Sequence, residues 1–122
     1  MKTMLIVEDS SYMRDIIKIL VKDLDIEVIG EAENGKEGVE KYIKYMPDIV
    51  TMDLAMEVED GYDALKKIMS HNPKAAVIVI TSASGQKPVI EEVLKLGAKV
   101  VFSKPVNKTQ FVEYMNELIL QL

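Results

Sequence analysis

The sequence of 122 residues contains no cysteine, and its only histidine is His71. Without cysteine the chain cannot form a disulfide, a thiolate zinc site or a cysteine nucleophile. With one histidine it cannot assemble a histidine-rich metal site or a histidine-based catalytic triad from its own residues. We expect His71, which stands in a Ser-His-Asn-Pro segment, to lie in a surface loop. A phosphotransfer module that carries phosphate on a helical histidine is therefore disfavoured.

Long hydrophobic runs are also absent, because no apolar stretch approaches the roughly 18 residues of a membrane-spanning helix. The amino terminus shows no secretory leader, so we expect a cytoplasmic protein that does not contact a membrane. The formal net charge is -5 and the sequence pI about 4.9, which disfavours a nucleic-acid-binding surface. Because the sequence shows no linker or repeat, residues 1–122 are predicted to form one domain that acts as a monomer.

What the sequence does contain is five short apolar runs, separated by stretches in which apolar residues recur at helical spacing. Such alternation predicts a doubly wound parallel sheet, since parallel neighbours need crossover helices. The second run is polar enough for an edge strand, and the first, third and fourth are the most apolar. The predicted fold is therefore α/β, a five-stranded parallel sheet of order 2-1-3-4-5 with helices on both faces, which is a flavodoxin-like arrangement. The runs cover residues 4–7, 26–29, 49–52, 77–80 and 100–102.

Residues that favour helix ends mark the boundaries of the five helical stretches. Gly97 is expected to end the fourth helix, and Pro88 to lie in its first turn, after Ser84 and Gly85. The other four helices have side chains that can accept a hydrogen bond from the first turn. These expected caps are Ser10, Asn34, Asp60 and Asn107.

Residues suited to bind metal or phosphate follow four of the five predicted strands. Glu8 and Asp9 follow the first strand, Asp53 the third, Ser82 the fourth and Lys104 the fifth. In an open parallel sheet, ligands bind outside the carboxyl ends of the strands, at the point where the strand order reverses. We therefore expect three carboxylates, a hydroxyl and an ammonium group to lie in one crevice.

Three carboxylates in one crevice repel each other, since two charges about 5 Å apart cost roughly 3 kcal/mol at an effective dielectric near 20. A divalent cation removes this repulsion, and oxygen ligands with free places for water and phosphate favour Mg2+. We expect Asp9, Asp53 and the backbone carbonyl of Ala55 as direct ligands, and Glu8 as a ligand acting through water. Asp53 could then attack a phosphoryl group, with Lys104 neutralising charge on its oxygens.

Seven segments together resemble the receiver domain of bacterial and archaeal two-component response regulators, especially the single-domain chemotaxis regulators. The resemblance implies that Asp53 is phosphorylated, that Glu8 and Asp9 are the acidic pair, and that Ser82 and Lys104 contact the phosphoryl group. The alanine after Ser82 favours it as the switch hydroxyl over Thr81, which stays the alternative. The segments are Val-Glu-Asp-Ser-Ser-Tyr-Met-Arg at 7–14, Ala-Glu-Asn-Gly-Lys-Glu at 32–37, Pro-Asp-Ile-Val-Thr-Met-Asp at 47–53, Asp-Gly at 60–61, Thr-Ser-Ala-Ser-Gly-Gln at 81–86, Gly-Ala at 97–98 and Lys-Pro at 104–105.

The resemblance further implies a switch that takes phosphate from a sensor histidine kinase of the chemotaxis type. It would catalyse only its own phosphorylation and dephosphorylation, and its output would be binding to a downstream protein such as a flagellar or archaellar motor. The alternatives are a phosphorelay intermediate, a magnesium-dependent phosphohydrolase and a degenerate receiver that only binds proteins. Two positions depart from the family pattern: Glu57 replaces the usual proline, and Val101 replaces the usual aromatic residue.

Overall fold

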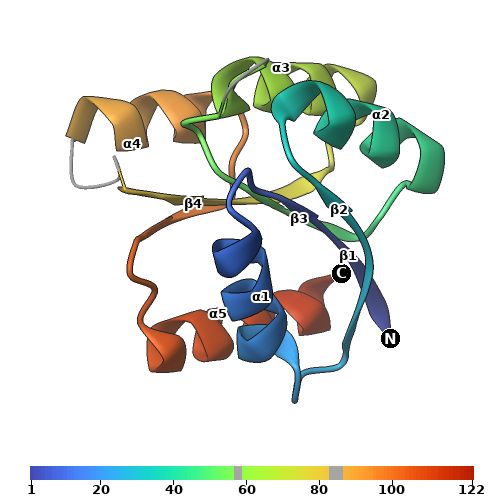
Figure 1. Ribbon diagram of the computed structural model, residues 1–122, viewed down its shortest axis with the longest axis vertical. Coiled ribbons are helices and arrows are strands. Elements are labelled where there is room, and N and C mark those ends of the chain that lie inside the picture. The colour runs from blue at the N-terminus through green and yellow to red at the C-terminus, as the bar shows by residue number, and fades with distance from the viewer. Residues whose placement is uncertain (57–58, 83–86) are drawn as a thin grey trace.

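The computed structural model describes residues 1–56, 59–82 and 87–122. Within these residues, five parallel strands form one sheet in the order β2-β1-β3-β4-β5, as predicted. Helices α2, α3 and α4 cover one face of the sheet, and α1 and α5 cover the other (Figure 1). The elements are β1 (Lys2–Val7), α1 (Ser11–Val21), β2 (Ile26–Ala32), α2 (Gly35–Tyr45), β3 (Ile49–Met52), α3 (Gly61–His71), β4 (Ala76–Thr81), α4 (Lys87–Lys95), β5 (Val100–Ser103) and α5 (Lys108–Gln121).

The apolar content of each strand matches its place in the sheet. Every residue of β3 and β4 is buried, and both strands are central. Strand β2 lies at the edge and is largely half-exposed, with a register shift against β1 between Met4 and Leu5. No helix in the described part of the chain is both long and apolar enough to cross a bilayer.

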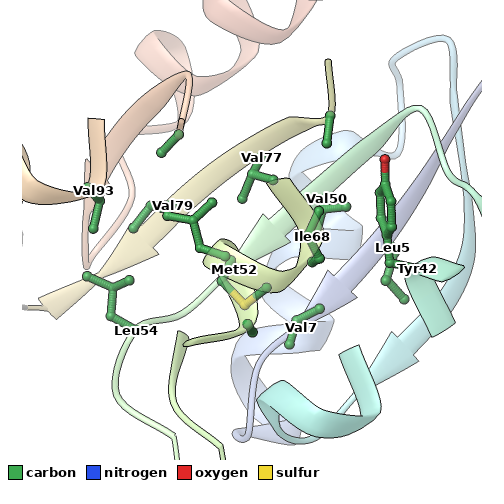
Figure 2. Packing of buried hydrophobic residues seen from close by; sticks show 14 of the residues in the cluster. Leu5, Val7, Tyr42, Val50, Met52, Leu54, Ile68, Val77, Val79 and Val93 are labelled. Atoms are coloured by element: carbon green, nitrogen blue, oxygen red, sulfur yellow. The ribbon is translucent and has the colours of Figure 1, made fainter. Parts of the chain in front are cut away.

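Alternating side chains of the strands divide the interior into two cores. Leu5 and Val7 of β1 point toward α2 and α3, while Met4 and Ile6 point toward α1 and α5. Figure 2 shows the first core, in which Met52 of β3 and Ile68 of α3 are both fully buried. Because both faces of each central strand are buried, a shift of one residue in register would exchange the two cores.

The expected helix caps are present. The side chains of Ser10, Asn34, Asp60 and Asn107 each accept a hydrogen bond from the backbone N–H three residues later. Gly97 follows α4 with a φ of 115°, a left-handed conformation that favours glycine. Pro88 lies in the first turn of α4, as predicted, whereas Ser84 and Gly85 lie outside the described residues.

The prediction for His71 was wrong. This residue is exposed, as expected, but it is the last residue of α3 and not part of a loop. The helix continues because Asn72 is the residue that precedes the proline, and Pro73 disfavours helical backbone only there. Asn72 has an extended conformation, and its N–H closes the helix on the carbonyl O of Ile68.

Gly61 lets the start of α3 approach the end of β3. Its N–H donates to the carbonyl O of Leu54 at 2.9 Å, and a Cβ atom added to Gly61 would lie 2.1 Å from the carbonyl O of Asp53. We therefore expect Gly61→Ala to lower the free energy of unfolding by about 1–3 kcal/mol, because the backbone must move apart. Urea denaturation measures this loss.

Gly30→Ala is the matched control, since its added Cβ would meet only the Leu5 side chain, at 3.3 Å. A loss for Gly61→Ala no larger than that for Gly30→Ala would contradict the close approach.

Candidate functional site

The acidic residues meet because β1 and β3 end side by side. Val7 pairs with Met52 in the last register position of the two strands. The N–H of Asp53 then donates to the carbonyl O of Val7 at 3.1 Å, and the N–H of Glu8 donates to the carbonyl O of Ala32 at 2.9 Å. Sheet hydrogen bonds therefore extend one residue past both strands and fix the backbones of Glu8 and Asp53 next to each other.

Three carboxylates share this edge of the sheet. Each of Glu8, Asp9 and Asp53 offers one oxygen, and these oxygens all lie within 4.8 Å of one another. Glu8 is 1% exposed and Asp53 is 5% exposed, whereas Asp9 is exposed. The cluster is thus closed on the protein side and open to solvent at Asp9.

Lys104 supplies the positive charge of the site. Its Nζ lies 2.6 Å from Glu8 Oε1 and 3.3 Å from Asp53 Oδ2. The residue directly follows β5, and its N–H donates to the carbonyl O of Thr81 at the end of β4. The end of β5 therefore brings Lys104 to a carboxylate 96 positions earlier in the sequence.

Burial and crowding change the protonation of Glu8. Burial, and then the hydrogen bond with the Asp9 carboxyl group, raise the pKa of Glu8 to about 7, against the opposing effects of Lys104 and the Ser10 amide. Burial disfavours charged Lys104, but its hydrogen bond to Glu8 and the charge of Asp53 raise its pKa overall. Lys104 is therefore a cation at neutral pH, while Glu8 titrates near neutrality.

The two hydroxyl residues at the end of β4 differ in exposure. Thr81 is fully buried within the strand and pairs with Ser103 of β5. Ser82 follows it and is exposed. A group entering from solvent can reach Ser82 and not Thr81, and this favours Ser82 as the hydroxyl of the site.

The loop after β3 also reaches the cluster. The N–H of Ala55 donates to Asp53 Oδ1 at 3.4 Å, so the backbone of this loop bends toward the Asp53 side chain. Glu57, which departs from the family pattern, lies outside the described residues. Val101 of β5 is half-buried and packs against the core on the α3 and α4 side of the sheet.

Arg14 belongs to the site, although it was not among the predicted site residues. Its Nη1 donates to the carbonyl O of Glu8 at 2.8 Å and to that of Asp9 at 3.3 Å. Its sequence signals are its place at the end of the family-like segment 7–14 and in the first turns of the helix that begins shortly after the acidic pair. Backbone carbonyls as partners leave no trace in the sequence.

The donor set fits a small hard cation. All three acidic side chains offer oxygen, which is the ligand type of Mg2+ and Ca2+, and the exposure of Asp9 leaves places for water or phosphate oxygens. With Lys104 opposite, the arrangement can hold a divalent cation and an incoming anionic group at once, which is the requirement for phosphoryl transfer.

Comparison with known proteins identifies the family. Residues 4–116 match the family described as the response regulator receiver domain. The chain belongs to this family. The receiver domain is 44% identical over 117 residues to the chemotaxis protein CheY of Thermotoga maritima, covering 96% of this chain and 97% of that protein. It is 42% identical over 116 residues to the chemotaxis protein CheY of Bacillus subtilis, covering 94% and 95%.

A solved structure of a family member has the same fold. The structure of the CheX-CheY-BeF3-Mg+2 complex from Borrelia burgdorferi matches with a TM-score of 0.91 and 29% identity, covering 97% of this chain and 89% of that chain. These findings confirm the predicted fold and the prediction of a phosphorylation-activated switch homologous to CheY. Receiver domains are signalling switches that bind Mg2+ at an acidic pocket, and this receiver has a Glu-Asp-Asp cluster at the expected edge of its sheet.

The raised pKa of Glu8 predicts a specific pH dependence for the metal-free protein. The pKa of Glu8 is about 7 in the folded protein, whereas its ordinary value is 4.5. Ionised Glu8 therefore lowers stability: the penalty is absent below pH 4.5 and complete above about pH 7. We expect Glu8→Gln to gain stability relative to wild type between pH 5 and pH 8, by on the order of 2 kcal/mol. Urea denaturation in the presence of a chelator measures the gain.

Glu40→Gln, at an exposed position of α2, is the control for removing one carboxylate. If the stability curves of Glu8→Gln and wild type run parallel from pH 5 to pH 8, Glu8 does not carry the penalty.

Proposed function

We propose that residues 1–122 form a single receiver domain that acts in the cytoplasm, in which Asp53 accepts a phosphoryl group from a phosphohistidine on a sensor kinase of the chemotaxis type. The observation that carries this proposal is the meeting of the buried Asp53 carboxylate with two further carboxylates and the Lys104 ammonium group. Its position at the carboxyl ends of the strands, in a chain homologous to CheY, supports the same role.

Phosphoryl transfer assigns a role to each residue of the site. An Asp53 oxygen attacks phosphorus while the bond to the histidine nitrogen breaks, and that nitrogen keeps the electron pair and takes up a proton. Asp9, Asp53 and the Ala55 carbonyl would hold Mg2+ directly, with Glu8 acting through water, and the ion would neutralise charge on the phosphoryl oxygens. Lys104 stays protonated and faces those oxygens from the end of β5.

The output is a change in protein binding. An aspartyl phosphate adds charge and strong hydrogen-bond acceptors close to the end of β4, where Ser82 is exposed. Ser82 would donate a hydrogen bond to the phosphoryl group, and this contact would draw Ser82 toward Asp53. The CheY homology favours a downstream partner in chemotaxis, such as a flagellar or archaellar motor protein.

The alternatives have weaker support. A phosphohydrolase of similar fold uses a second acid two residues after its nucleophile, and that position here is Ala55. A degenerate receiver would not need to keep three carboxylates and a lysine together at the cost of their mutual repulsion. A phosphorelay intermediate uses the same site, so the fate of the phosphoryl group separates it from a terminal switch.

Phosphorylation can be tested with acetyl phosphate and MgCl2. Intact-mass spectrometry should show a mass gain of one phosphoryl group that decays with time, and Asp53→Asn should abolish it because the nucleophile is removed. Asp63→Asn, at an exposed position of α3, is the matched control and should keep the gain. Wild type without any adduct would favour the degenerate module, and sustained phosphate release would favour the phosphohydrolase.

The role of Ser82 has a separate test. Ser82→Ala should still form the adduct but lose the phosphorylation-dependent NMR shifts of backbone amides in α4, because no hydroxyl then contacts the phosphoryl group. Thr81→Val should keep these shifts, since Thr81 is buried within β4. Loss of the shifts in Thr81→Val and not in Ser82→Ala would transfer the role to Thr81.

A further inference from the structure

Arg14 lies beside the carboxylate cluster and has no part in the proposed phosphoryl transfer. Only 13% of its side chain is exposed, and its Nε donates to Glu31 Oε1 at 3.2 Å. Its Nη1 donates to the carbonyl groups of Glu8 and Asp9 at 2.8 and 3.3 Å. One side chain therefore joins α1, the segment after β1 and the end of β2.

The two carbonyl groups belong to the two peptide planes that flank the Cα atom of Asp9. Because a peptide unit is planar, holding both units fixes the φ and ψ angles of Asp9, and with them the direction of its Cα–Cβ bond. The unit after Asp9 is held a second time, since the N–H of Ser10 donates to Glu8 Oε2 at 3.1 Å. Asp9 is the exposed member of the cluster, so packing contributes little to the orientation of its side chain, and the direction set by its backbone matters more.

Glu31 holds Arg14 in this position. Glu31 Oε1 accepts from Arg14, and Oε2 accepts from Lys18 Nζ at 3.1 Å. The next residue, Ala32, accepts the N–H of Glu8. The end of β2 thus supports the acidic pair twice, once through the backbone and once through Glu31 and Arg14. The planar guanidinium group can direct its donors to a carboxylate and two carbonyls at once, which an ammonium group cannot do in fixed directions.

We propose that Arg14 is a positioning residue that aims the Asp9 carboxylate at the divalent cation. This role rests on the proposed function, because it requires a cation at the cluster. A purely electrostatic role predicts an effect of the opposite sign: a guanidinium group close to a metal ion repels it, so removing the charge would tighten metal binding. Positioning predicts that removing Arg14 weakens metal binding by about 10-fold to 100-fold, the usual effect of losing a residue that orients a ligand.

The test is a titration with MgCl2, followed through the backbone amide NMR signals of the full chain without phosphodonor. We expect Arg14→Met and Arg14→Lys each to weaken Mg2+ binding about tenfold or more. Lys18→Met is the matched control, because Lys18 also pairs with Glu31, but its other ion pair is with Asp15 on the surface of α1. This variant should bind Mg2+ with nearly wild-type affinity.

Equal or tighter Mg2+ binding by Arg14→Met would overturn the positioning role, and so would full affinity in Arg14→Lys. If the spectrum shows that Arg14→Met is unfolded, Glu31→Gln decides instead: it keeps the guanidinium charge but releases its anchor, and it should weaken binding in the same direction. Unchanged affinity in Glu31→Gln would then overturn the proposal. Wild type that shows no Mg2+-dependent shifts would refute the metal site itself, a result distinct from any difference between variants.

Discussion

Repulsion among three carboxylates is the constraint on which the rest of this site depends. Glu8, Asp9 and Asp53 offer oxygens within 4.8 Å of one another, and two of the three residues are buried. A pair of charges at such a separation costs a few kcal/mol even in a polarisable site, which is a sizeable part of a typical net folding stability of about 5–15 kcal/mol. Burial, and after it the neighbouring acidic groups, raises the pKa of Glu8 to about 7.

Backbone hydrogen bonds, more than contacts between the carboxylates, hold the acidic residues close together. Strands β1 and β3 continue their ladder to Glu8 and Asp53, and Gly61 allows the carbonyl group of Asp53 to lie against the start of α3. Lys104 arrives from the other half of the sequence and relieves part of the repulsion. The sheet and the glycine thus fix the backbones of the acidic residues, and the lysine offsets part of their negative charge.

Strand order and the meeting of the acidic residues with Lys104 could be predicted, because both follow from the period of the apolar residues and from where parallel strands end. The four helix caps were predictable for a different reason, because a cap is a local contact between one side chain and the first turn of its helix. His71 was wrongly predicted to lie in a loop. A proline constrains mainly the residue directly before it, so Pro73 acts on Asn72, and α3 continues to His71. The place of Arg14 beside the acidic pair could not be predicted, because there it contacts backbone carbonyls, which every residue has.

The charge of the site explains why a cation and a phosphoryl group belong together here. With all carboxylates ionised, three negative groups and Lys104 leave a formal charge of -2, which one divalent cation neutralises. An anionic donor would otherwise meet a negative crevice, so a cation held by these carboxylates would favour its approach. The charged groups follow the ends of β1, β3 and β5, whereas the side chain of Val101 packs against the core. The departure from the family pattern at Val101 therefore lies outside this charged cluster.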